Sequence, residues 1–391
     1  MKKSILGIVG AFVLTLPWII VKISGTGVSP AIEALFSGLA IVGGAFVLSW
    51  AAEVAEVDVP MSVSLALVAL IAVLPEYAVD MYFAWKAGKY PAMQYHHYAV
   101  ANMTGANRLL IGIGWAIVVL FAATLQRKKE IELKKRLKLE SSFLLIATIY
   151  AFILPLKGSI SLFDSLVFIS IYACYIFFAL RSPKEEPELI GIPAFIASFP
   201  KKVRRIMVIC MFIFSGYVIY ISVEAFAEGL IKVGALHGLD PFLMVQWVAP
   251  LASESPELIV AFYMVKKLRA TSSMNVLISS KLNQWTLLIG TLAIVYSIAI
   301  GYPSALIMDS RQREEVLLTA AQSLFGVAVI SDMKISVVEA LLLLSLFLSQ
   351  LIVTHVRARY LFSLIYILLA ILWVIRQDGV RRLCSSLGTR K

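Results

Sequence analysis

Charged residues are scarce in this sequence. Only 15% of the 391 residues are Asp, Glu, Lys or Arg, whereas 60% are hydrophobic, and the mean hydropathy is +0.88. A soluble protein of this length cannot bury so much apolar surface. The composition therefore excludes a soluble enzyme and predicts a chain that crosses a lipid bilayer many times. The formal net charge of +11 requires no nucleic-acid partner, because Lys and Arg in the loops of membrane proteins set their orientation.

Cysteine and histidine are also rare. The three cysteines are widely spaced, which argues against a disulfide framework, a CxxC pair and a zinc site. The four histidines lie outside the centres of the apolar runs, which argues against an intramembrane enzyme that uses a serine and a histidine. These histidines are His96, His97, His237 and His355. The sequence predicts no enzymatic activity and no permanently bound cofactor.

About twelve apolar runs are long enough to cross a bilayer, which takes roughly 20 apolar residues in a helix. We expect spans at residues 5–21, 31–52, 61–85, 98–125, 141–156, 162–180, 206–233, 241–265, 273–300, 314–331, 335–354 and 360–375. The predicted fold class is an all-α integral membrane protein with about 12 transmembrane helices. The first run is expected to stay in the chain as a helix, because no clear small-x-small cleavage site follows it. The hydrophilic stretch 126–140 is expected to be a helical loop or a helix extension.

Positive charge divides unequally between the two sides of this topology. With twelve spans, 24 of the 35 Lys and Arg residues lie on the side of the two termini and nine on the opposite side. The positive-inside rule then places both termini and the mid-chain loop 181–205 in the cytoplasm. We therefore expect a multi-pass protein of the cell membrane with cytoplasmic termini.

Acidic residues interrupt two of the apolar runs, each time beside a proline. The first pair occurs in LPEYAVD, where Glu76 is followed four residues later by Asp80. The second occurs in SESPEL, where Glu254 lies three residues before Glu257. At these spacings both acids of a pair lie on one face of a helix. A single intramembrane acid could be a protonated structural residue, but acids are costly in a membrane and two matched pairs indicate a function.

The sequence around these acids is repeated. When the two Pro-Glu pairs are aligned, Asn107 falls opposite Asn283. The repeated unit has five spans, and an odd number of crossings puts the two copies in opposite orientations, as in many transporters. We expect an extra N-terminal helix, a first repeat, a cytoplasmic linker, a second repeat, and an extra C-terminal helix with a basic tail. Their residues are 1–30, 31–180, 181–205, 206–354 and 355–391.

Proline beside a carboxylate suits a cation site. Proline removes a backbone donor and frees a carbonyl about one turn earlier, and inside a membrane such groups persist only within protein or around a lined cavity. Carboxylates and carbonyls from two inverted copies would form an oxygen cage, which Ca²⁺ prefers with roughly six to eight ligands. Inverted repeats favour alternating access. Two alternatives from other functional classes stay open. One is a cation channel, and the other is an intramembrane enzyme built on an acid pair. Measuring ion flux into vesicles distinguishes both from an antiporter.

These motifs resemble those of the calcium/cation antiporter superfamily, the sodium/calcium exchanger family. The matching elements are LPE at 74–76 and SPEL at 255–258, then GAN at 105–107 and SKLNQ at 280–284. The resemblance covers residues 31–354. It implies a ten-helix core that works as a secondary active cation antiporter by alternating access, with one additional helix at each end.

The resemblance also implies which residues bind ions. Glu76 and Glu257 are expected to bind Ca²⁺ at the membrane midplane, with neighbouring oxygens binding Na⁺ or shuttling protons. Further candidate ligands are the second acid of each pair and the two aligned asparagines, although membrane asparagines also serve as interhelical hydrogen-bond partners. These candidates are Asp80, Glu254, Asn107 and Asn283.

Three residues depart from the family pattern. Lys281 stands in the place of a motif asparagine, and Arg108 and Gln284 lie near the position of a motif Asn or Asp. Because arginine stays charged, we expect Arg108 either to reach water or to pair with Asp80 or Glu76 as a tethered cation that replaces one exchanged ion. Sodium is the expected counter-ion, with protons as the alternative because the site has surplus acids and few hydroxyl groups.

Overall fold

The computed structural model describes residues 2–58, 74–127, 129–134, 137–181, 189–353 and 355–377. The chain forms two compact units, each made of two separate stretches. Unit 1 comprises Met1–Phe83 and Leu180–Pro256, and unit 2 comprises Ala84–Ala179 and Glu257–Lys391. The boundaries fall inside two helices, α4 and α12. Each unit thus combines spans from both halves of the chain.

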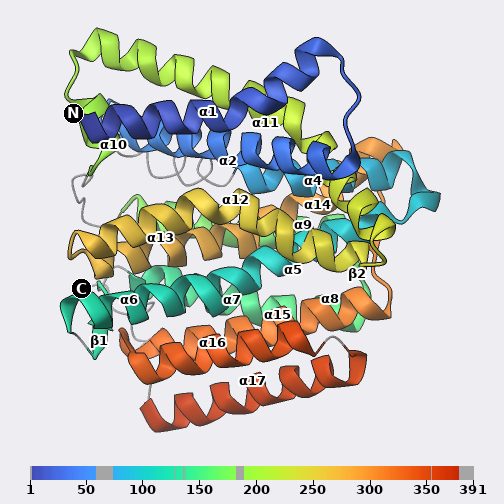
Figure 1. Ribbon diagram of the computed structural model, residues 1–391. Coiled ribbons are helices and arrows are strands. Elements are labelled where there is room, and N and C mark those ends of the chain that lie inside the picture. Colours follow the sequence, from blue (N-terminus) through green and yellow to red (C-terminus); the bar gives the residue numbers. More distant parts are fainter. Residues whose placement is uncertain are drawn as a thin grey trace. The chain divides into compact units, whose positions relative to one another are not determined.

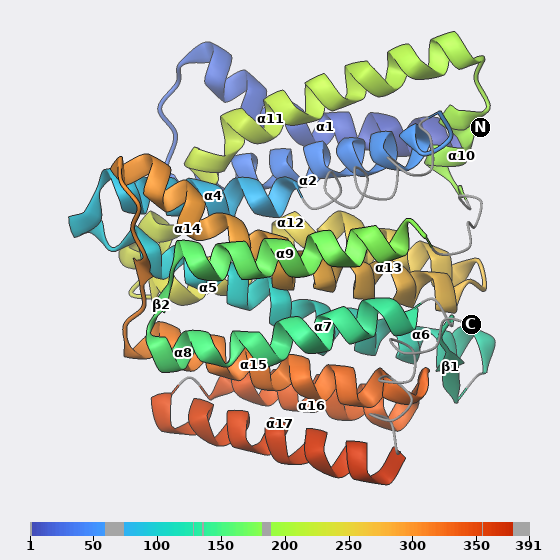
Figure 2. The same cartoon turned by 180° about the vertical axis from the view of Figure 1, so that it is seen from behind.

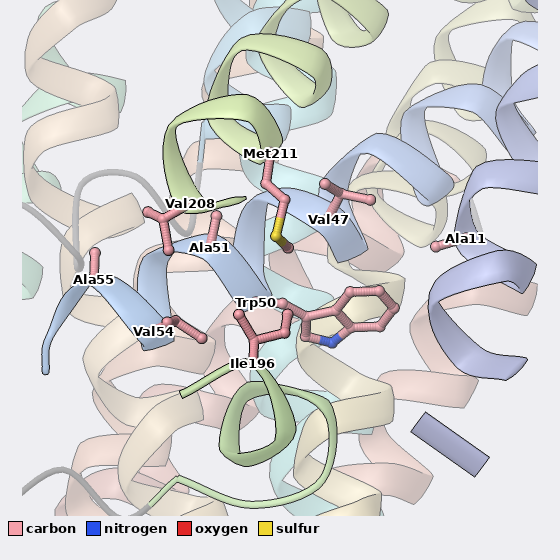
Figure 3. Packing of buried hydrophobic residues seen from close by; sticks show 9 residues of the cluster. All are labelled: Ala11, Val47, Trp50, Ala51, Val54, Ala55, Ile196, Val208 and Met211. Atoms are coloured by element: carbon pink, nitrogen blue, oxygen red, sulfur yellow. The ribbon is translucent and has the colours of Figure 1, made fainter. Parts of the chain in front are cut away.

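Unit 1 is built mainly on long apolar helices (Figure 1). Its elements are α1 (Lys2–Ser24), α2 (Pro30–Ala55), α10 (Ile192–Ala197), α11 (Lys201–Leu236), the first part of α4 (Leu74–Lys89) and most of α12 (Pro241–Lys266). Figure 3 shows Trp50 of α2 between Ile196 of α10 and Met211 of α11, in the hydrophobic core of this unit. The indole of Trp18 donates a hydrogen bond to the carbonyl of Ile221 at 3.0 Å, which ties α1 to α11.

Unit 2 contains the remaining elements. In chain order they are η1 (Pro91–Met93), α5 (Tyr95–Leu109), η2 (Leu110–Trp115), α6 (Ala116–Gln126), β1 (Glu130–Glu132), α7 (Leu137–Ala151), α8 (Ile153–Lys157), β2 (Ser159–Ile160), α9 (Leu162–Ala179), α13 (Ala270–Asn283), η3 (Gln284–Leu288), α14 (Ile289–Ile300), β3 (Leu306–Ile307), α15 (Ser310–Val329), η4 (Ile330–Asp332), β4 (Lys334–Ser336), α16 (Val337–Ile352) and α17 (Val356–Gln377). The helix α17 packs along α15 (Figure 1), and α7 lies beside α9 (Figure 2).

Eleven of the twelve expected spans correspond to helices in the described residues. Ten helical segments are long and apolar enough to cross a membrane, and α16 is a shorter apolar helix. The third expected span, 61–85, falls largely on residues 59–73, which lie outside the described part of the chain. The expected span 314–331, which opens on charged residues, is α15, and 89% of its most apolar 18 residues are buried. Its polar side chains therefore contact protein rather than lipid, which explains its composition.

The hydrophilic stretch 126–140 is helical only at its two ends in the described residues, at Gln126 and from Leu137 onward. Arg127 adopts a left-handed backbone conformation with φ 53°, and β1 follows. This strand pairs antiparallel with β4, and Lys334 Nζ of β4 lies 2.8 Å from Glu130 Oε1. Ile131 is buried between two exposed glutamates, a period of two that is typical of a strand. The expected helix extension holds for residues 137–140, which begin α7, whereas β1 replaces the expected helical loop.

Corresponding features occur in the two halves of unit 2. A π-helical segment joins α5 to α6 in the first half, as η2, and α13 to α14 in the second, as η3. Two short strands follow in each half, β1 and β2 in the first and β3 and β4 in the second. β1 pairs with β4, and β2 pairs with β3. This exchange of partners between the halves is what a two-fold relation between inverted repeats requires.

Capping boxes fix the first residues of α15 and α16. The carboxylate of Asp309 accepts a hydrogen bond from the backbone N–H of Gln312, and the Gln312 side chain accepts one from the backbone N–H of Asp309. Ser336 and Glu339 form the same arrangement at the start of α16. Such caps satisfy backbone donors that the helix leaves unpaired. The caps therefore fix the residues at which α15 and α16 begin.

Gly112 in η2 allows α16 to pack closely. A Cβ atom added to Gly112 would lie 2.3 Å from Cγ of Phe347, whose side chain is fully buried. We expect Gly112→Ala to destabilise the folded protein by about 1–3 kcal/mol, because overpacking displaces neighbouring side chains. The measurement is the thermal unfolding temperature of the purified protein in detergent. Gly216→Ala in α11 is the control, since nothing lies within 4 Å of its added Cβ. Equal unfolding temperatures for the two variants would contradict the prediction.

Candidate ion-binding site

Three of the candidate acids belong to unit 1, and all are buried. Glu76 and Asp80 lie four residues apart on α4, and Glu254 lies on α12. Their exposed fractions are 1%, 0% and 2%. The spacing of four residues puts Glu76 and Asp80 on one face of α4, as expected. Burying three carboxylates is costly unless protons, cations or polar groups compensate them, so their burial is consistent with a cation site.

Pro256 contributes to the same stretch of α12. The helix continues through Pro250 and Pro256 without ending. Because Pro256 has no N–H, the carbonyl of Ala252, four residues earlier, receives no backbone hydrogen bond from it. The second Pro-Glu motif therefore places a released carbonyl within about one and a half turns of two acids, as the sequence indicated.

The fourth acid, Glu257, belongs to unit 2 and is held by α13. Its exposed fraction is 9%, and Ser280 donates a hydrogen bond from Oγ to Glu257 Oε2 at 2.7 Å. Gln284, one turn further along, lies with Nε2 3.4 Å from the same Ser280 oxygen. The Pro-Glu motif and the SKLNQ motif of the second repeat thus meet in the fold. Carboxylate and hydroxyl oxygens in one place are ligand types that hard cations prefer.

A contact between α5 of the first repeat and α13 of the second repeat lies next in the chain to Ser280. Lys281 donates a hydrogen bond from Nζ to Oδ1 of Asn107 at 2.7 Å, and both residues have an exposed fraction of 0%. The ammonium group also lies over the ring of Trp285, 4.2 Å from its centroid. The amide of Asn107 is oriented by a hydrogen bond from Nδ2 to the carbonyl of Met103 at 2.8 Å.

The structure changes the register in which the repeats correspond. Asn107 lies three residues before η2, and Lys281 lies three residues before η3. Counted from the first residue of each π-helical segment, Asn107 has the position of Lys281, whereas the sequence alignment placed it opposite Asn283. Asn283 donates a hydrogen bond to the hydroxyl of Tyr172 in α9 at 3.2 Å. This contact makes Asn283 an interhelical hydrogen-bond partner, one of the two roles considered for it.

Arg108 has an acidic partner that the sequence analysis did not consider. It is fully buried, so it does not reach water. Its ion pair is with Glu315 of α15, with Nη2 2.6 Å from Oε2. Nη1 donates to the side-chain oxygen of Gln350 at 3.2 Å, and Nε donates to the carbonyl of Thr104. All three guanidinium nitrogens thus have partners within unit 2. A pairing of Arg108 with Asp80 or Glu76 would join the two units and stays a prediction.

The partners of Arg108 form a buried polar network across α5, α15, α16 and α17. Arg359 of α17 forms an ion pair with the same carboxylate, that of Glu315. Gln322 donates to the carbonyl of Arg108 at 3.1 Å, and Gln350 donates to the Gln322 side chain at 3.0 Å. Both arginines and Glu315 have exposed fractions of at most 1%. Glu315 therefore compensates two buried positive charges.

Acidic side chains alone do not form a metal site in the described residues. Within the described residues, no group of three or more His, Cys, Asp or Glu side chains could hold a metal ion. A cation bound at Glu257 would need hydroxyl, amide or backbone oxygens in addition, and Ser280 supplies one. We did not count Ser280 among the candidates, although it lies in the SKLNQ motif. The meeting of Glu76 with Glu257 would join the two units and stays a prediction.

Comparison with known proteins gives the family. The family model described as sodium/calcium exchanger protein matches residues 29–181 and 207–356. The chain belongs to this family. Members are membrane antiporters for calcium and other cations and are not enzymes, so the predicted superfamily, fold class and absence of enzymatic activity are confirmed. A comparison with curated protein sequences gives no significant match.

Solved structures extend the similarity to nearly the whole chain. A crystal structure of the H⁺/Ca²⁺ exchanger CAX is 53% identical, covers 98% of this chain and 97% of its own, and has a TM-score of 0.95. A structure of the sodium-calcium exchanger NCX_Mj is 17% identical over 82% of this chain and 97% of its own, with a TM-score of 0.55. Native YfkE is 17% identical over 88% of this chain and 98% of its own, with a TM-score of 0.61. The last two show that the fold is shared.

Proposed function

We propose that this chain exchanges Ca²⁺ for protons by alternating access. The observation that supports protons is the identity of 53% with the H⁺/Ca²⁺ exchanger CAX over 98% of the chain. The sodium-calcium exchanger NCX_Mj, at 17% identity, shares the fold and carries no argument about the counter-ion. Of the two counter-ions that the sequence left open, protons therefore replace Na⁺ as the favoured one.

In this proposal Glu76 and Glu257 bind Ca²⁺ near the membrane midplane. Ser280 orients Glu257 and adds a hydroxyl oxygen, while Asp80 and Glu254 add negative charge to the surroundings. When Ca²⁺ leaves, buried carboxylates cannot remain uncompensated in a medium of low dielectric constant. Protons restore neutrality without needing ligands of their own, whereas a sodium ion needs a set of oxygens. Surplus acids with few hydroxyl groups thus suit proton exchange.

The test is Ca²⁺ uptake by the purified protein in proteoliposomes. Vesicles with an acidic interior, diluted into alkaline buffer that contains Ca²⁺ and choline as the sole monovalent salt, should take up Ca²⁺ while protons leave. An ionophore that collapses the pH gradient should abolish accumulation of Ca²⁺ above its external concentration. A sodium gradient of the same size without a pH gradient should drive none. Uptake driven by sodium alone would overturn the choice of counter-ion.

The same experiment separates the antiporter from a channel. A channel passes Ca²⁺ only down its own gradient, so it cannot raise the internal Ca²⁺ concentration above the external one in response to a pH gradient. An antiporter can, because protons that leave down their gradient drive Ca²⁺ inward. Failure to accumulate Ca²⁺ while the pH gradient is intact would therefore contradict the proposed function altogether.

We further propose the topology that the sequence indicates. The two repeats are residues 31–180 and 206–354, with the linker 181–205 and both chain ends on the cytoplasmic side of the cell membrane. The distribution of Lys and Arg, 24 on that side against nine on the other, supports this orientation. Protease accessibility of the linker in sealed vesicles of known orientation tests it.

A further inference from the structure

A buried lysine next to the proposed calcium site is the feature that the proposed function leaves unused. Lys281 directly follows Ser280, which hydrogen-bonds to Glu257. It stands where the other repeat has Asn107, at the same distance from a π-helical segment. One repeat thus presents an amide at this position and the other presents a cation, and the two side chains contact each other.

The surroundings of the ammonium group are those of a cation site. The oxygen of Asn107 accepts a hydrogen bond from it at 2.7 Å, and the face of Trp285 lies 4.2 Å away. Both an amide oxygen and an indole face attract cations. The amide cannot simply turn to offer its nitrogen, because Nδ2 is engaged with the carbonyl of Met103. The position is therefore fixed to receive positive charge.

Charge balance gives this lysine a consequence for transport. A fixed ammonium group offsets one carboxylate of the site in every state of the transport cycle. In an exchanger without such a group, a mobile cation has to neutralise that carboxylate when the site returns without Ca²⁺. The ammonium group also repels Ca²⁺ and so weakens its binding.

From these contacts we infer that the ammonium group of Lys281 is a resident cation of the transport site. It occupies the position beside Asn107 that a monovalent metal ion would otherwise take, and it reduces the number of counter-ions needed for the return step by one. The inference rests on the proposed function in that Glu257 belongs to the calcium site. It deepens that proposal by naming the residue that makes sodium unnecessary.

Three substitutions separate charge from shape. Lys281→Asn gives the second repeat the amide that the first repeat has at Asn107. Lys281→Met keeps much of the volume and removes the charge, and Lys281→Arg keeps the charge. Each variant is checked for a monodisperse elution profile and for its unfolding temperature before use.

Two measurements then test the inference. Equilibrium binding of Ca²⁺ in detergent should be about tenfold tighter for the Asn and Met variants, because a nearby positive charge is gone, and unchanged within about twofold for the Arg variant. In proteoliposomes, the Asn variant should require Na⁺ or another monovalent metal ion on the side where Ca²⁺ is released. The charge returned per Ca²⁺ should rise by one.

Two outcomes would overturn the inference. One is that the folded Asn and Met variants keep the parent's Ca²⁺ affinity and remain indifferent to sodium. Another concerns the unsubstituted protein and is informative even if every variant misfolds. Competition by Na⁺ or K⁺ against Ca²⁺ binding in that protein would show that the position is open to a metal ion. Failure of the proposed function looks different, since the parent would then show no uptake driven by a pH gradient while the binding measurements still decide the role of Lys281.

Discussion

Replacing Glu257 by Gln is expected to abolish Ca²⁺ transport while leaving a folded protein. The substitution keeps the shape of the side chain and its ability to accept a hydrogen bond from Ser280. It removes one negative charge from a buried cation site. Loss of one member of a buried charge pair costs about 2–5 kcal/mol, so Ca²⁺ binding should weaken at least about 30-fold. Uptake into proteoliposomes under a pH gradient should fall to the level of vesicles without protein.

A control variant shows whether the loss of transport is specific to Glu257. Glu224→Gln in α11 removes the same charge from an exposed position on a membrane-spanning helix and should leave uptake at the parent rate. Glu76→Gln should reproduce the loss seen with Glu257→Gln, because the proposal gives the two acids equivalent roles. If either acid can be neutralised with uptake unchanged, that acid is not a ligand of the transported ion. An unaltered unfolding temperature for the Gln variants would show that binding is lost and not the fold.

The sequence predicted those parts of the fold and site that depend on local patterns. Apolar length located eleven spans in the described residues, and helical spacing placed Glu76 and Asp80 on one face of α4. Burial of the four acids agrees with their placement within apolar runs. Each of these properties follows from neighbours within a few turns of a helix, which a single sequence displays directly.

The partners of the buried bases were not predictable in the same way. Arg108 and Glu315 are separated by 207 positions in the chain, and no local pattern connects them. The reasoning from charge was sound in requiring a partner for a buried arginine, but it chose among the acids of the Pro-Glu motifs. It also assigned the tethered cation to Arg108, whereas the contact with Asn107 is made by Lys281. Only packing decides between such candidates.

Glu315→Gln is expected to have the largest effect on stability. The carboxylate of Glu315 lies 2.6 Å from Arg108 and also forms an ion pair with Arg359, and all three side chains are buried. A neutral amide would leave two guanidinium groups close together without adequate compensation. Removing one partner of a buried ion pair costs about 3–5 kcal/mol, and here one carboxylate contacts both bases, whereas Glu314 approaches Arg359 at the longer distance of 3.9 Å. Since folded proteins are stable by only about 5–15 kcal/mol, most of the variant should be misfolded or aggregated.

The control is an ion pair of the same type at the surface. Glu130→Gln removes the partner of Lys334 between β1 and β4, where both side chains are more than 40% exposed. Exposed pairs contribute about 0–1 kcal/mol, so this variant should unfold near the parent temperature. The readouts are the yield of monodisperse protein and the unfolding temperature in detergent. A Glu315→Gln variant that matched Glu130→Gln in both would contradict the prediction.

The same network gives the C-terminal helix a role that its position in the sequence does not suggest. The family model ends at residue 356, so α17 lies almost entirely beyond it, yet Arg359 of α17 is one of the two bases that Glu315 compensates. The double variant Glu315→Gln with Arg359→Gln removes one base together with the acid that contacts both bases. Arg108 then has no second base beside it, so the repulsion between the two bases is gone and part of the lost stability should return. A double variant that is no more stable than Glu315→Gln alone would show that Arg359 packs against this network without sharing its charge, and that α17 is not electrostatically joined to the helix that carries Asn107.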